Sequence, residues 1–492
     1  MPITSAILDA AARHPDCVAI AGDDGRLTYA ELVADSRRVA AAVDALHRAH
    51  PVDAAPETRG IPITAVSVGS AFHTARIVAG LAGYRAVSAA IDPRWPLAHR
   101  VGVVLQTGIG VVVGEDPAFA AALRERGWHG AFVGLDALDR HGTAAPPTVR
   151  DADEAFLLLF SSGTTSDPKA FLKTRGQYRA NVAVSSAHLE PLPGVQTLAP
   201  GPVSYSLTLY AVIECLATAG GVHLADAFHP LDAARTIRDE GITRVVAVPA
   251  VVQGLVDAAR RDAAALAGLD LVVTGGAHLP ASLRDGLAGV LPRTRLVNYY
   301  GAAEIGFIGD SRGGAHLDVY DGIEVRIRDD AGRDLPDGDL GTLWVRAAAC
   351  SDGYLAGTSD AVLRGPDGWA TVHDQARIVD GRLALAGRAG DIVATGGHKV
   401  SLADVERAFD GMAGAVCAIA LPHETLGSVV ALVVEGDAAS KEALAGRART
   451  ALAPQFAPRR WYRVPRLPRT VGGKVRRGET AALVARGEAE RL

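Results

Sequence analysis

The sequence is poor in the residues that build disulfide frameworks, zinc sites and membrane spans. Its 492 residues include only 4 cysteines, without a C-x-x-C pair or neighbouring histidines, which excludes a local zinc motif and a disulfide framework. They are Cys17, Cys215, Cys350 and Cys417. The longest apolar runs, such as residues 155–160 and 245–252, are far shorter than the roughly 20 residues that cross a bilayer. We interpret these runs as buried strands and expect no membrane span.

A strong excess of charge of one sign is also absent. The 50 Lys and Arg residues and 55 Asp and Glu residues give a formal net charge of −5, which lacks the basic field that nucleic-acid binding needs. Residues 1–16 (MPITSAILDAAARHPD) have no cationic start and contain Asp9 and Arg13, so they predict an amphipathic helix and not a signal peptide. We therefore expect a cytoplasmic protein without a nucleic-acid partner.

The composition that remains is that of an ordinary globular protein. Apolar residues make up 49% and charged residues 21%, and the length predicts about three folding units of ~150 residues each. Short β-branched runs alternate with Ala-rich helical stretches, which is typical of parallel sheets covered by helices in an α/β fold. The expected strands lie at residues 63–68, 110–114, 156–160, 244–249 and 269–276, and the expected helices at 31–46, 231–240 and 283–291.

The pattern changes twice towards the C-terminus. After about residue 311, short alternating strands with Gly and Asp turns predict an antiparallel sheet or a small barrel. A second change comes at residue 387, where GRAGD interrupts the strands before a compact stretch of mixed helix and strand. We therefore expect an N-terminal unit of residues 1–387, with a β-rich subdomain at about 311–386, and a C-terminal α+β unit of residues 388–492.

One segment carries the strongest chemical signal. Residues 160–170 (FSSGTTSDPKA) follow a strand and combine small, hydroxyl-bearing residues with Lys169. Backbone N–H groups and hydroxyls in such a loop can converge on phosphate oxygens, and the lysine adds a positive charge. No glycine precedes Lys169, which excludes the G-x-x-x-x-G-K-S/T loop. Taken alone, the segment would fit an exposed Ser/Thr loop better.

The same segment resembles the signature Y/F-S/T-S-G-T-T-G-x-P-K-G of the adenylate-forming superfamily, which includes acyl-CoA synthetases, nonribosomal-peptide adenylation domains and luciferases. Ser166 and Ala170 stand where that signature has glycine. Segments 26–32, 80–96 and 341–355 resemble further motifs of the superfamily in the same order, so the resemblance, closest to acyl-CoA synthetases, covers almost the whole chain. It implies a large N-terminal domain hinged to a small mobile C-terminal domain.

The resemblance also implies a nucleotide site. Residues 297–304 (VNYYGAAE) resemble N-x-Y-G-x-T-E, which implies that Tyr300 stacks on adenine and that Glu304 holds Mg²⁺. Ala303 stands in place of the usual threonine. Residues 274–280 (TGGAHLP) resemble the loop beside the adenine and acyl pockets, although alone they would fit a plain strand-to-helix turn equally well. The implied nucleotide-binding residues are Ser161, Ser162, Gly163, Thr164, Thr165, Lys169, Gly275, Gly276, Ala277, Tyr299, Tyr300, Gly301, Ala302, Asp374 and Arg388.

Two of these residues lie near the C-terminal boundary. Within residues 372–378, Asp374 is the implied acceptor of hydrogen bonds from the ribose hydroxyls, a role that suits an ionised carboxylate. Residues 385–406 resemble the hinge motif of the superfamily, which implies that Arg388 contacts ribose or phosphate. Without the resemblance, this stretch would be a surface hairpin leading into a helix at 402–409.

The hinge motif and the tail imply the moving parts. Gly390 falls at the hinge position, where glycine allows a wide change of backbone angles, and Gly396 and Gly397 border the implied thiol channel. Residues 467–479 resemble the segment P-x-T-x-x-G-K-x-x-R, whose lysine is catalytic in the superfamily. A lone lysine near a terminus is otherwise a solvated charge. The catalytic residues implied in this way are Thr165, Glu304 and Lys474.

The acyl pocket is less clearly encoded. Residues 199–221 resemble the P-L-x-H-S-x-G-L segment of acyl-CoA synthetases, with Tyr205 where histidine is common. Ser206 and Leu207 occupy the place where amino-acid-activating relatives carry Phe-Asp, which favours an apolar fatty or aryl acid over an α-amino acid. Tyr205 also fits a core aromatic with a satisfied hydroxyl. The implied pocket residues are Tyr205, Ser206, Gly276 and Gly301.

These features predict an AMP-forming acid–thiol ligase. It would use ATP and Mg²⁺ to convert a carboxylic acid into an acyl-AMP and then pass the acyl group to coenzyme A. The first alternative is a freestanding enzyme that loads the phosphopantetheine of an acyl carrier protein, since no G-x-D/H-S-L/I attachment motif follows Lys474. An alternative of another class is a non-catalytic nucleotide-binding paralogue. It is suggested by Ser166, Ala170 and Ala303, and the retained acidic and basic site residues oppose it.

Overall fold

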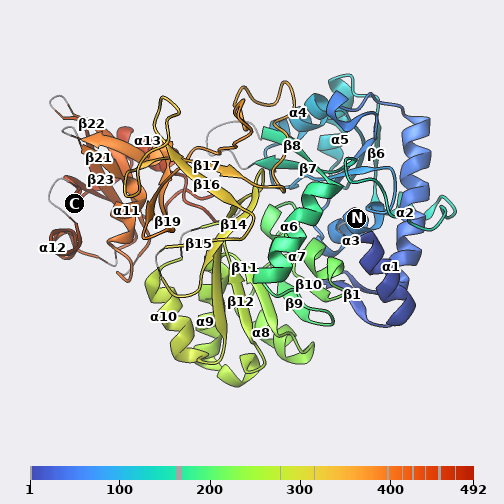
Figure 1. Ribbon diagram of the computed structural model, residues 1–492, viewed down its shortest axis with the longest axis horizontal. Coiled ribbons are helices and arrows are strands. Elements are labelled where there is room, and N and C mark those ends of the chain that lie inside the picture. The colour runs from blue at the N-terminus through green and yellow to red at the C-terminus, as the bar shows by residue number, and fades with distance from the viewer. Residues whose placement is uncertain are drawn as a thin grey trace.

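Two mainly parallel sheets and their helices make up most of the protein, seen here as a computed structural model (Figure 1). The structure describes residues 3–161, 169–277, 279–314, 316–395, 398–412, 414–423, 426–437, 439–452, 456–470 and 473–492. Within these residues the larger sheet has nine strands, in the order β15-β14-β13-β12-β11-β9-β10-β1-β2. The strands from β13 to β1 run parallel. Their bounds are β1 Val18–Gly22, β2 Gly25–Thr28, β9 Gln196–Ala199, β10 Gly221–Leu224, β11 Arg244–Ala247, β12 Leu271–Thr274, β13 Arg295–Ala302, β14 Gly306–Ser311 and β15 Asp318–Val319.

The second sheet has the described strand order β6-β5-β3-β4-β7-β8 and is parallel up to β7, which pairs antiparallel with β8. Its strands are β3 Ile63–Ser67, β4 Val87–Ala90, β5 Ile109–Gly114, β6 Ala131–Val133, β7 Ala155–Ser161 and β8 Lys169–Thr174. Strands buried on both faces need continuous apolar runs, and β3, β4 and β5 are buried at every position. The predicted α/β class with parallel sheets is confirmed.

Ten helices of the described N-terminal residues cover and separate the two sheets. They are α1 Thr4–Arg13, α2 Tyr29–Ala49, α3 Ala71–Leu81, α4 Leu97–Thr107, α5 Pro117–Glu125, α6 Arg175–His188, α7 Ser206–Ala217, α8 Pro230–Asp239, α9 Pro249–Arg261 and α10 Ala281–Val290. Residues of α3 and α7, such as Val78 and Ile213, share one buried cluster with Leu157 of β7 and Val246 of β11. The main core therefore lies between the sheets, whereas α8, α9 and α10 pack together against the larger sheet (Figure 1).

The segment 245–252 is not a continuous strand, so that prediction was wrong in its second half. β11 ends at Ala247, and α9 begins at Pro249. Proline is favoured at the first position of a helix, because its ring fixes a helical φ and the N–H that it lacks has no partner there anyway. Val251 and Val252 are buried as the sequence suggested, but they are buried on a helix.

The β-rich part forms an open sheet and not a barrel. β16 Glu324–Arg328, β17 Gly341–Arg346, β18 Asp374–Val379 and β19 Arg382–Arg388 pair antiparallel in that order, and no closed barrel is found in the part of the chain that the structure describes. Four short strands cannot close on themselves without large tilt and stagger. Asp374, a predicted site residue, begins the inner strand β18 of this sheet.

The C-terminal sheet contains β20 Ile392–Thr395, β21 His398–Ser401, β22 Val416–His423, β23 Gly427–Glu435, β24 Arg460–Val464 and β25 Glu490–Arg491. Three helices accompany it among the described residues: α11 Leu402–Arg407, α12 Lys441–Ala451 and α13 Arg477–Ala485. Two apolar clusters form on this sheet, one containing Phe409 and Trp461 and the other containing Ile419 and Val464. The short turn Ala389–Asp391 links β19 to β20. The unit boundary at residue 387 stays a prediction.

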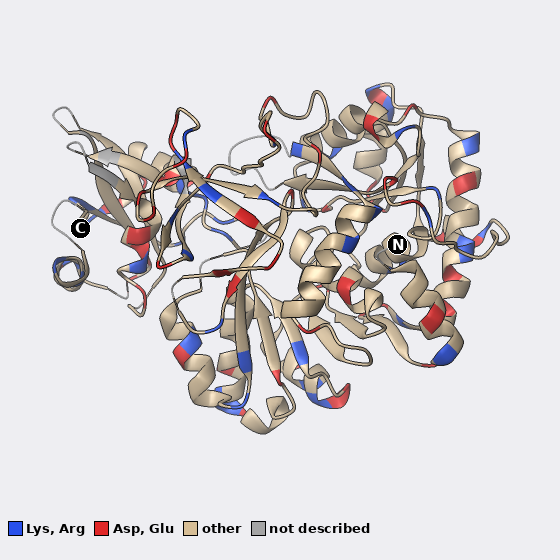
Figure 2. Cartoon of the chain, in the orientation of Figure 1, with Lys and Arg blue, Asp and Glu red and all other residues tan. Residues whose placement is uncertain are grey.

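Charged residues of both signs are interspersed along the outer helices, whereas the central strands carry mostly other residues (Figure 2). This distribution agrees with the nearly balanced charge of the sequence. Among the described helices, none combines the length and the apolar character that a membrane crossing requires.

Candidate active site

The Ser/Thr-rich loop connects two paired strands. Ser161 at the end of β7 lies opposite Lys169 at the start of β8 in the antiparallel ladder. The predicted residues Ser162, Gly163, Thr164 and Thr165 fall outside the described residues. The ammonium of Lys169 lies 5.1 Å from the centre of the Tyr354 ring, a cation–π distance. The loop base is thereby tied to the segment around Tyr354.

Glu304 lies near the strand ends Ser161 and Lys169 that bound the loop, in the turn between β13 and β14. Its carboxylate Oε1 accepts a 3.0 Å hydrogen bond from the Tyr354 hydroxyl, and its backbone oxygen accepts one of 2.7 Å from the Ser351 N–H. The side chains of Lys169 and Glu304 therefore meet on the same tyrosine. Glu304 is only 7% exposed, so this residue is largely shielded from bulk water.

Tyr300 and Asp374 are also brought together. The Tyr300 hydroxyl donates a 2.5 Å hydrogen bond to Asp374 Oδ2. Asp374 pairs with Arg388 across β18 and β19, so the two implied ribose contacts are neighbours in the ladder, although the Arg388 side chain lies outside what the structure describes. The sequence motifs that carry Tyr300 and Asp374 thus meet where the nine-stranded sheet contacts the four-stranded sheet.

The glycines of the 274–280 loop allow a close approach to Tyr299. A Cβ on Gly275 would lie 2.5 Å from Tyr299 Cε1, so a larger residue would displace the ring. Gly276 has a φ of +77°, in the region that favours glycine, and is exposed together with Ala277. Burial raises the pKa of the Tyr299 hydroxyl. Tyr299 therefore stays neutral. Its ring packs between the 274–280 loop and the main hydrophobic cluster.

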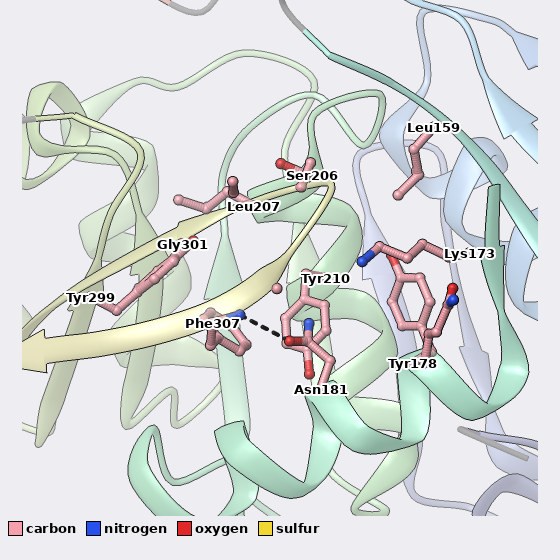
Figure 3. A pocket seen from close by; sticks show the side chains of 14 residues that line it. Leu159, Lys173, Tyr178, Asn181, Ser206, Leu207, Tyr210, Tyr299, Gly301 and Phe307 are labelled. Carbon is pink, nitrogen blue, oxygen red and sulfur yellow. Dashed lines mark hydrogen bonds between the residues drawn. The ribbon is translucent and has the colours of Figure 1, made fainter. Parts of the chain in front are cut away.

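A cavity of about 490 Å³, a volume that includes open solvent, is lined in part by residues 301–303 (Figure 3). Of the four predicted pocket residues, Ser206 and Gly301 line it, and Tyr205 and Gly276 are not among its described lining residues. Tyr205 instead occupies the position before the first residue of α7. The lining residues are Leu159, Lys173, Gln177, Tyr178, Asn181, Ser206, Leu207, Tyr210, Tyr299, Gly301, Ala302, Ala303, Gly306 and Phe307.

Sequence reasoning missed Lys173, Asn181, Tyr210 and Phe307. For Lys173 a signal was present: Lys169, Phe171 and Lys173 are spaced two residues apart in β8, so their side chains share one face of the strand, and Phe171 is fully buried. Lysines that share a strand face with a buried aromatic residue are candidates for functional groups. The others come from helices and strands whose neighbours in space are distant in sequence.

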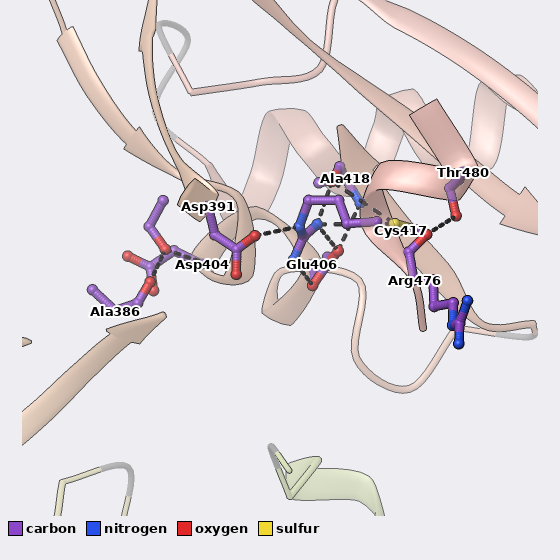
Figure 4. A network of polar contacts seen from close by, with 10 residues as sticks. Ala386, Asp391, Asp404, Glu406, Cys417, Ala418, Arg476 and Thr480 are labelled. Atoms are coloured by element: carbon purple, nitrogen blue, oxygen red, sulfur yellow. Dashed lines mark hydrogen bonds and ion pairs between the residues drawn. The ribbon is translucent and has the colours of Figure 1, made fainter. Parts of the chain in front are cut away.

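The hinge and tail residues lie in the C-terminal sheet unit. Gly390 is exposed in the Ala389–Asp391 turn, and Lys474 is exposed in the turn before α13, where its backbone oxygen accepts a 2.7 Å hydrogen bond from the Thr470 N–H. Gly396 and Gly397 lie outside the described residues. Arg477, three positions after Lys474, forms a 2.7 Å ion pair with Asp391 and a second pair with Glu406 (Figure 4). The hinge turn and the Lys474 turn are therefore connected.

Taken together, a two-sheet parallel fold and acidic and aromatic residues gathered at strand ends beside a Ser/Thr-rich loop define a nucleotide-using α/β enzyme. Residues 7–355 match the AMP-binding enzyme family, and the chain belongs to this family.

Relatives match the chain along almost its full length. It is 27% identical to a salicylyl-CoA synthase / salicylate adenylyltransferase of Streptomyces sp, with 99% of this chain and 94% of that protein covered. It is 26% identical to the fatty acid–[acyl-carrier-protein] ligase MmaC of Mycobacterium marinum, with 97% and 96% covered. The crystal structure of ATP-bound MatB from Rhodopseudomonas palustris superimposes with a TM-score of 0.85 at 21% identity, over 97% and 98% of the two chains. The family and its acyl-CoA ligase members confirm the predicted enzyme class, an AMP-forming acid–thiol ligase.

Proposed function

We propose that the protein activates a fatty or aryl carboxylic acid with ATP to an acyl-AMP and transfers the acyl group to the thiol of coenzyme A. One observation supports the proposal: the predicted nucleotide-site residues Tyr300 and Glu304 flank residues 301–303, which line the cavity. An acid in the cavity would therefore have its carboxylate next to the α-phosphate of ATP.

The reaction then needs little covalent help from the protein. A carboxylate oxygen attacks the α-phosphorus, the bond to the β-phosphate oxygen breaks, and pyrophosphate leaves; no proton is transferred in this step. The thiol next attacks the acyl carbon, loses its proton to solvent, and the carbon–oxygen bond to AMP breaks. Positioning and neutralisation of phosphate charge are the main tasks, for which Lys169 and Lys474 are the proposed cations.

Glu304 is the proposed protein ligand of Mg²⁺. No group of three or more acidic, His or Cys side chains is placed to hold a metal ion among the described residues. Mg²⁺ commonly binds through one or two carboxylates and the phosphates of its substrate, so a single glutamate beside the phosphate loop fits this ion. When bound, Mg²⁺ would neutralise charge on the phosphates of ATP.

Two observations support an acid without an α-amino group. Ser206 and Leu207 at the start of α7 supply no carboxylate to pair with an ammonium, and both line the cavity. An unpaired buried ammonium costs several kcal/mol, on the order of 10³-fold in selectivity. α-Amino acids should therefore be much poorer substrates than des-amino acids of the same shape.

The thiol acceptor has two candidates. The relatives include enzymes named for coenzyme A and for an acyl carrier protein, and an acyl carrier protein is the alternative partner to coenzyme A. Both acceptors end in the same phosphopantetheine thiol. Since ATP and coenzyme A are its substrates, we place the enzyme in the cytoplasm.

The test is acid-dependent pyrophosphate release over a panel of fatty, aryl and amino acids, followed by thioester formation with coenzyme A or with a loaded carrier protein. We expect release with one class of des-amino acids and thioester formation with coenzyme A. Preferred release with an α-amino acid would overturn the assignment of the 199–221 segment. ATP binding without release on any acid would instead favour a non-catalytic nucleotide-binding protein.

A further inference from the structure

The cavity wall contains a buried lysine that the proposed chemistry does not use. Lys173 lies in β8, one residue before Thr174, and its side chain extends from that strand toward Tyr210 (Figure 3). Of the described residues that line the cavity, Lys173 is the only one with a charged side chain. It is 4% exposed, so its ammonium is screened from bulk water.

The position of Lys173 is fixed by its neighbours. Thr174 and Gln177 form a reciprocal capping box at the start of α6, with hydrogen bonds of 3.2 and 2.9 Å, so β8 must end where it does. The Lys173 ammonium donates to the backbone oxygens of Glu304, at 2.8 Å, and of Ala349. The nitrogen is therefore held at the cavity wall and does not swing freely.

Its hydrogen-bonding capacity is not used up by these two contacts. An ammonium has three N–H donors, and the two backbone oxygens take two of them. Among the described residues, no carboxylate forms an ion pair with Lys173. Burial lowers its pKa to about 8, and nearby Glu304 and Cys350 act against this effect. The group is thus mostly charged at neutral pH and has no ion-pair partner among the described residues.

A buried charge without an ion-pair partner is unfavourable, and a protein tolerates it where the charge has a ligand. The remaining wall combines apolar surfaces such as Leu159 and Phe307 with amide and phenol groups. Two of those groups already have partners: Asn181 Oδ1 accepts a 3.0 Å hydrogen bond from the Phe307 N–H, and the Tyr210 hydroxyl lies 3.2 Å from that of Ser185. Lys173 is left as the strongest donor facing the cavity.

We propose that Lys173 determines acid specificity by donating to an oxygen acceptor, a hydroxyl or a second carboxylate, on the acyl chain or ring of the substrate. The inference rests on the proposed function and narrows its substrate class from apolar acids to acids that carry such a group. Lys173 could instead donate to the reacting carboxylate or to the α-phosphate of ATP. Its loss would then affect every acid equally, so the experiment below separates these cases.

The test compares matched acids in the wild-type enzyme and in Lys173→Met, which keeps an unbranched side chain, one atom shorter, and removes its charge. The pairs are hexanoate with adipate and benzoate with its hydroxylated derivatives. In pyrophosphate release, we expect the wild type to prefer the acceptor-bearing member of at least one pair. Lys173→Met should lower kcat/KM for that acid about 10–100-fold more than it lowers kcat/KM for the unsubstituted acid. Lys441→Met, an exposed lysine of α12, is the control for charge loss.

The outcomes separate the two proposals. An equal loss for every acid in Lys173→Met, or no wild-type preference within any pair, would overturn the specificity role. If no acid releases pyrophosphate, the proposed function fails, and acid binding measured by thermal shift decides the inference independently. Stabilisation of the wild type by the acceptor-bearing acid, lost in Lys173→Met, would support it; equal stabilisation of both proteins would overturn it.

Discussion

The Tyr300 hydroxyl donates a 2.5 Å hydrogen bond to Asp374 Oδ2, although the two residues lie 74 positions apart in the sequence. Tyr300 belongs to β13 of the nine-stranded sheet and Asp374 to β18 of the open four-stranded sheet. The bond therefore fixes the relative position of two sheets at the place where the base and the ribose of a nucleotide are proposed to bind.

Tyr300→Phe tests this link, since it keeps the ring for stacking and removes only the hydroxyl. Asp374 loses the donor that orients it, and a hydrogen bond to a charged group is worth roughly 1.5–3 kcal/mol, so we expect the KM for ATP to rise about tenfold or more. The KM for the acid should change little. Tyr84→Phe is the matched control, because the Tyr84 hydroxyl donates to the Ala145 oxygen at an exposed place outside the site. An unchanged KM for ATP would remove Asp374 from the ribose site.

Much of the fold could be predicted from local pattern. β3 and β5 coincide with mainly apolar, β-branched runs, because a strand covered on both faces favours apolar residues at most positions. The segment 245–252 was misread because Val251 and Val252 are equally apolar on a helix face and in a strand. Only Pro249 marks the change, because proline is favoured in the first turn of a helix.

The contacts between the candidate site residues could not be predicted from local pattern. Motifs such as 297–304 place Tyr300 and Glu304 in order along the chain, but the contacts of Tyr300 with Asp374 and of Glu304 with Tyr354 depend on how sheets pack. Lys173 was missed because a lysine is usually solvated, and its burial follows from strand alternation together with the position of α6.

Glu304→Gln should reduce adenylation on the order of 10²-fold or more, because it removes the charge that is proposed to hold Mg²⁺ and keeps the volume and the Tyr354 contact. Pyrophosphate release measured against Mg²⁺ concentration gives the effect directly, with circular dichroism as the check on folding. Glu324→Gln, which alters an exposed glutamate of β16, should behave as wild type. Near-normal release of pyrophosphate by Glu304→Gln at limiting Mg²⁺ would exclude Glu304 from the metal site.

Glu214 of α7 and Arg244 of β11 form a buried ion pair, and both side chains are 2% exposed. Glu214→Ala leaves a buried guanidinium without its partner, so we expect a loss of about 3–5 kcal/mol in stability, seen as a lower midpoint of thermal unfolding. Glu240→Ala breaks the exposed pair with Arg26 and should cost about 1 kcal/mol or less. Equal midpoints for the two variants would show that burial does not govern the Glu214 pair.

His223 predicts how stability depends on pH. It is buried, its Nε2 lies 2.9 Å from Gln196 Oε1, and burial lowers its pKa from 6.5 to about 4. The folded state favours the neutral ring, so below pH 6.5 the unfolded chain binds more protons, and stability is lost as the pH falls toward 4. The unfolding midpoint of His223→Gln should fall less steeply over this range than that of the wild type or of the exposed control His14→Gln. Parallel curves for all three proteins would contradict the prediction.

The two half-reactions should respond to different residues of the C-terminal unit. Lys474→Ala should remove a transition-state contact from adenylation, worth roughly 3–4 kcal/mol or about 10²–10³ in rate, and leave thioester formation from supplied acyl-AMP largely intact. Gly390→Pro fixes φ at the proposed pivot, so adenylation should stay measurable and thioester formation should fall, provided that the proline traps the adenylating arrangement.

Gly390→Ala separates stiffening of the pivot from simple crowding. Among the described residues, no atom lies within 4 Å of the place where a Cβ on Gly390 would be, so alanine adds bulk without a clash and without fixing φ. Thioester formation should then survive in Gly390→Ala and fail in Gly390→Pro, measured on acyl-AMP with coenzyme A. Because Arg477 pairs with Asp391 next to this pivot, circular dichroism must first establish that each variant keeps the fold. Equal loss of both half-reactions in folded Lys474→Ala would make Lys474 a structural residue, and equal behaviour of the two Gly390 variants would place the hinge elsewhere.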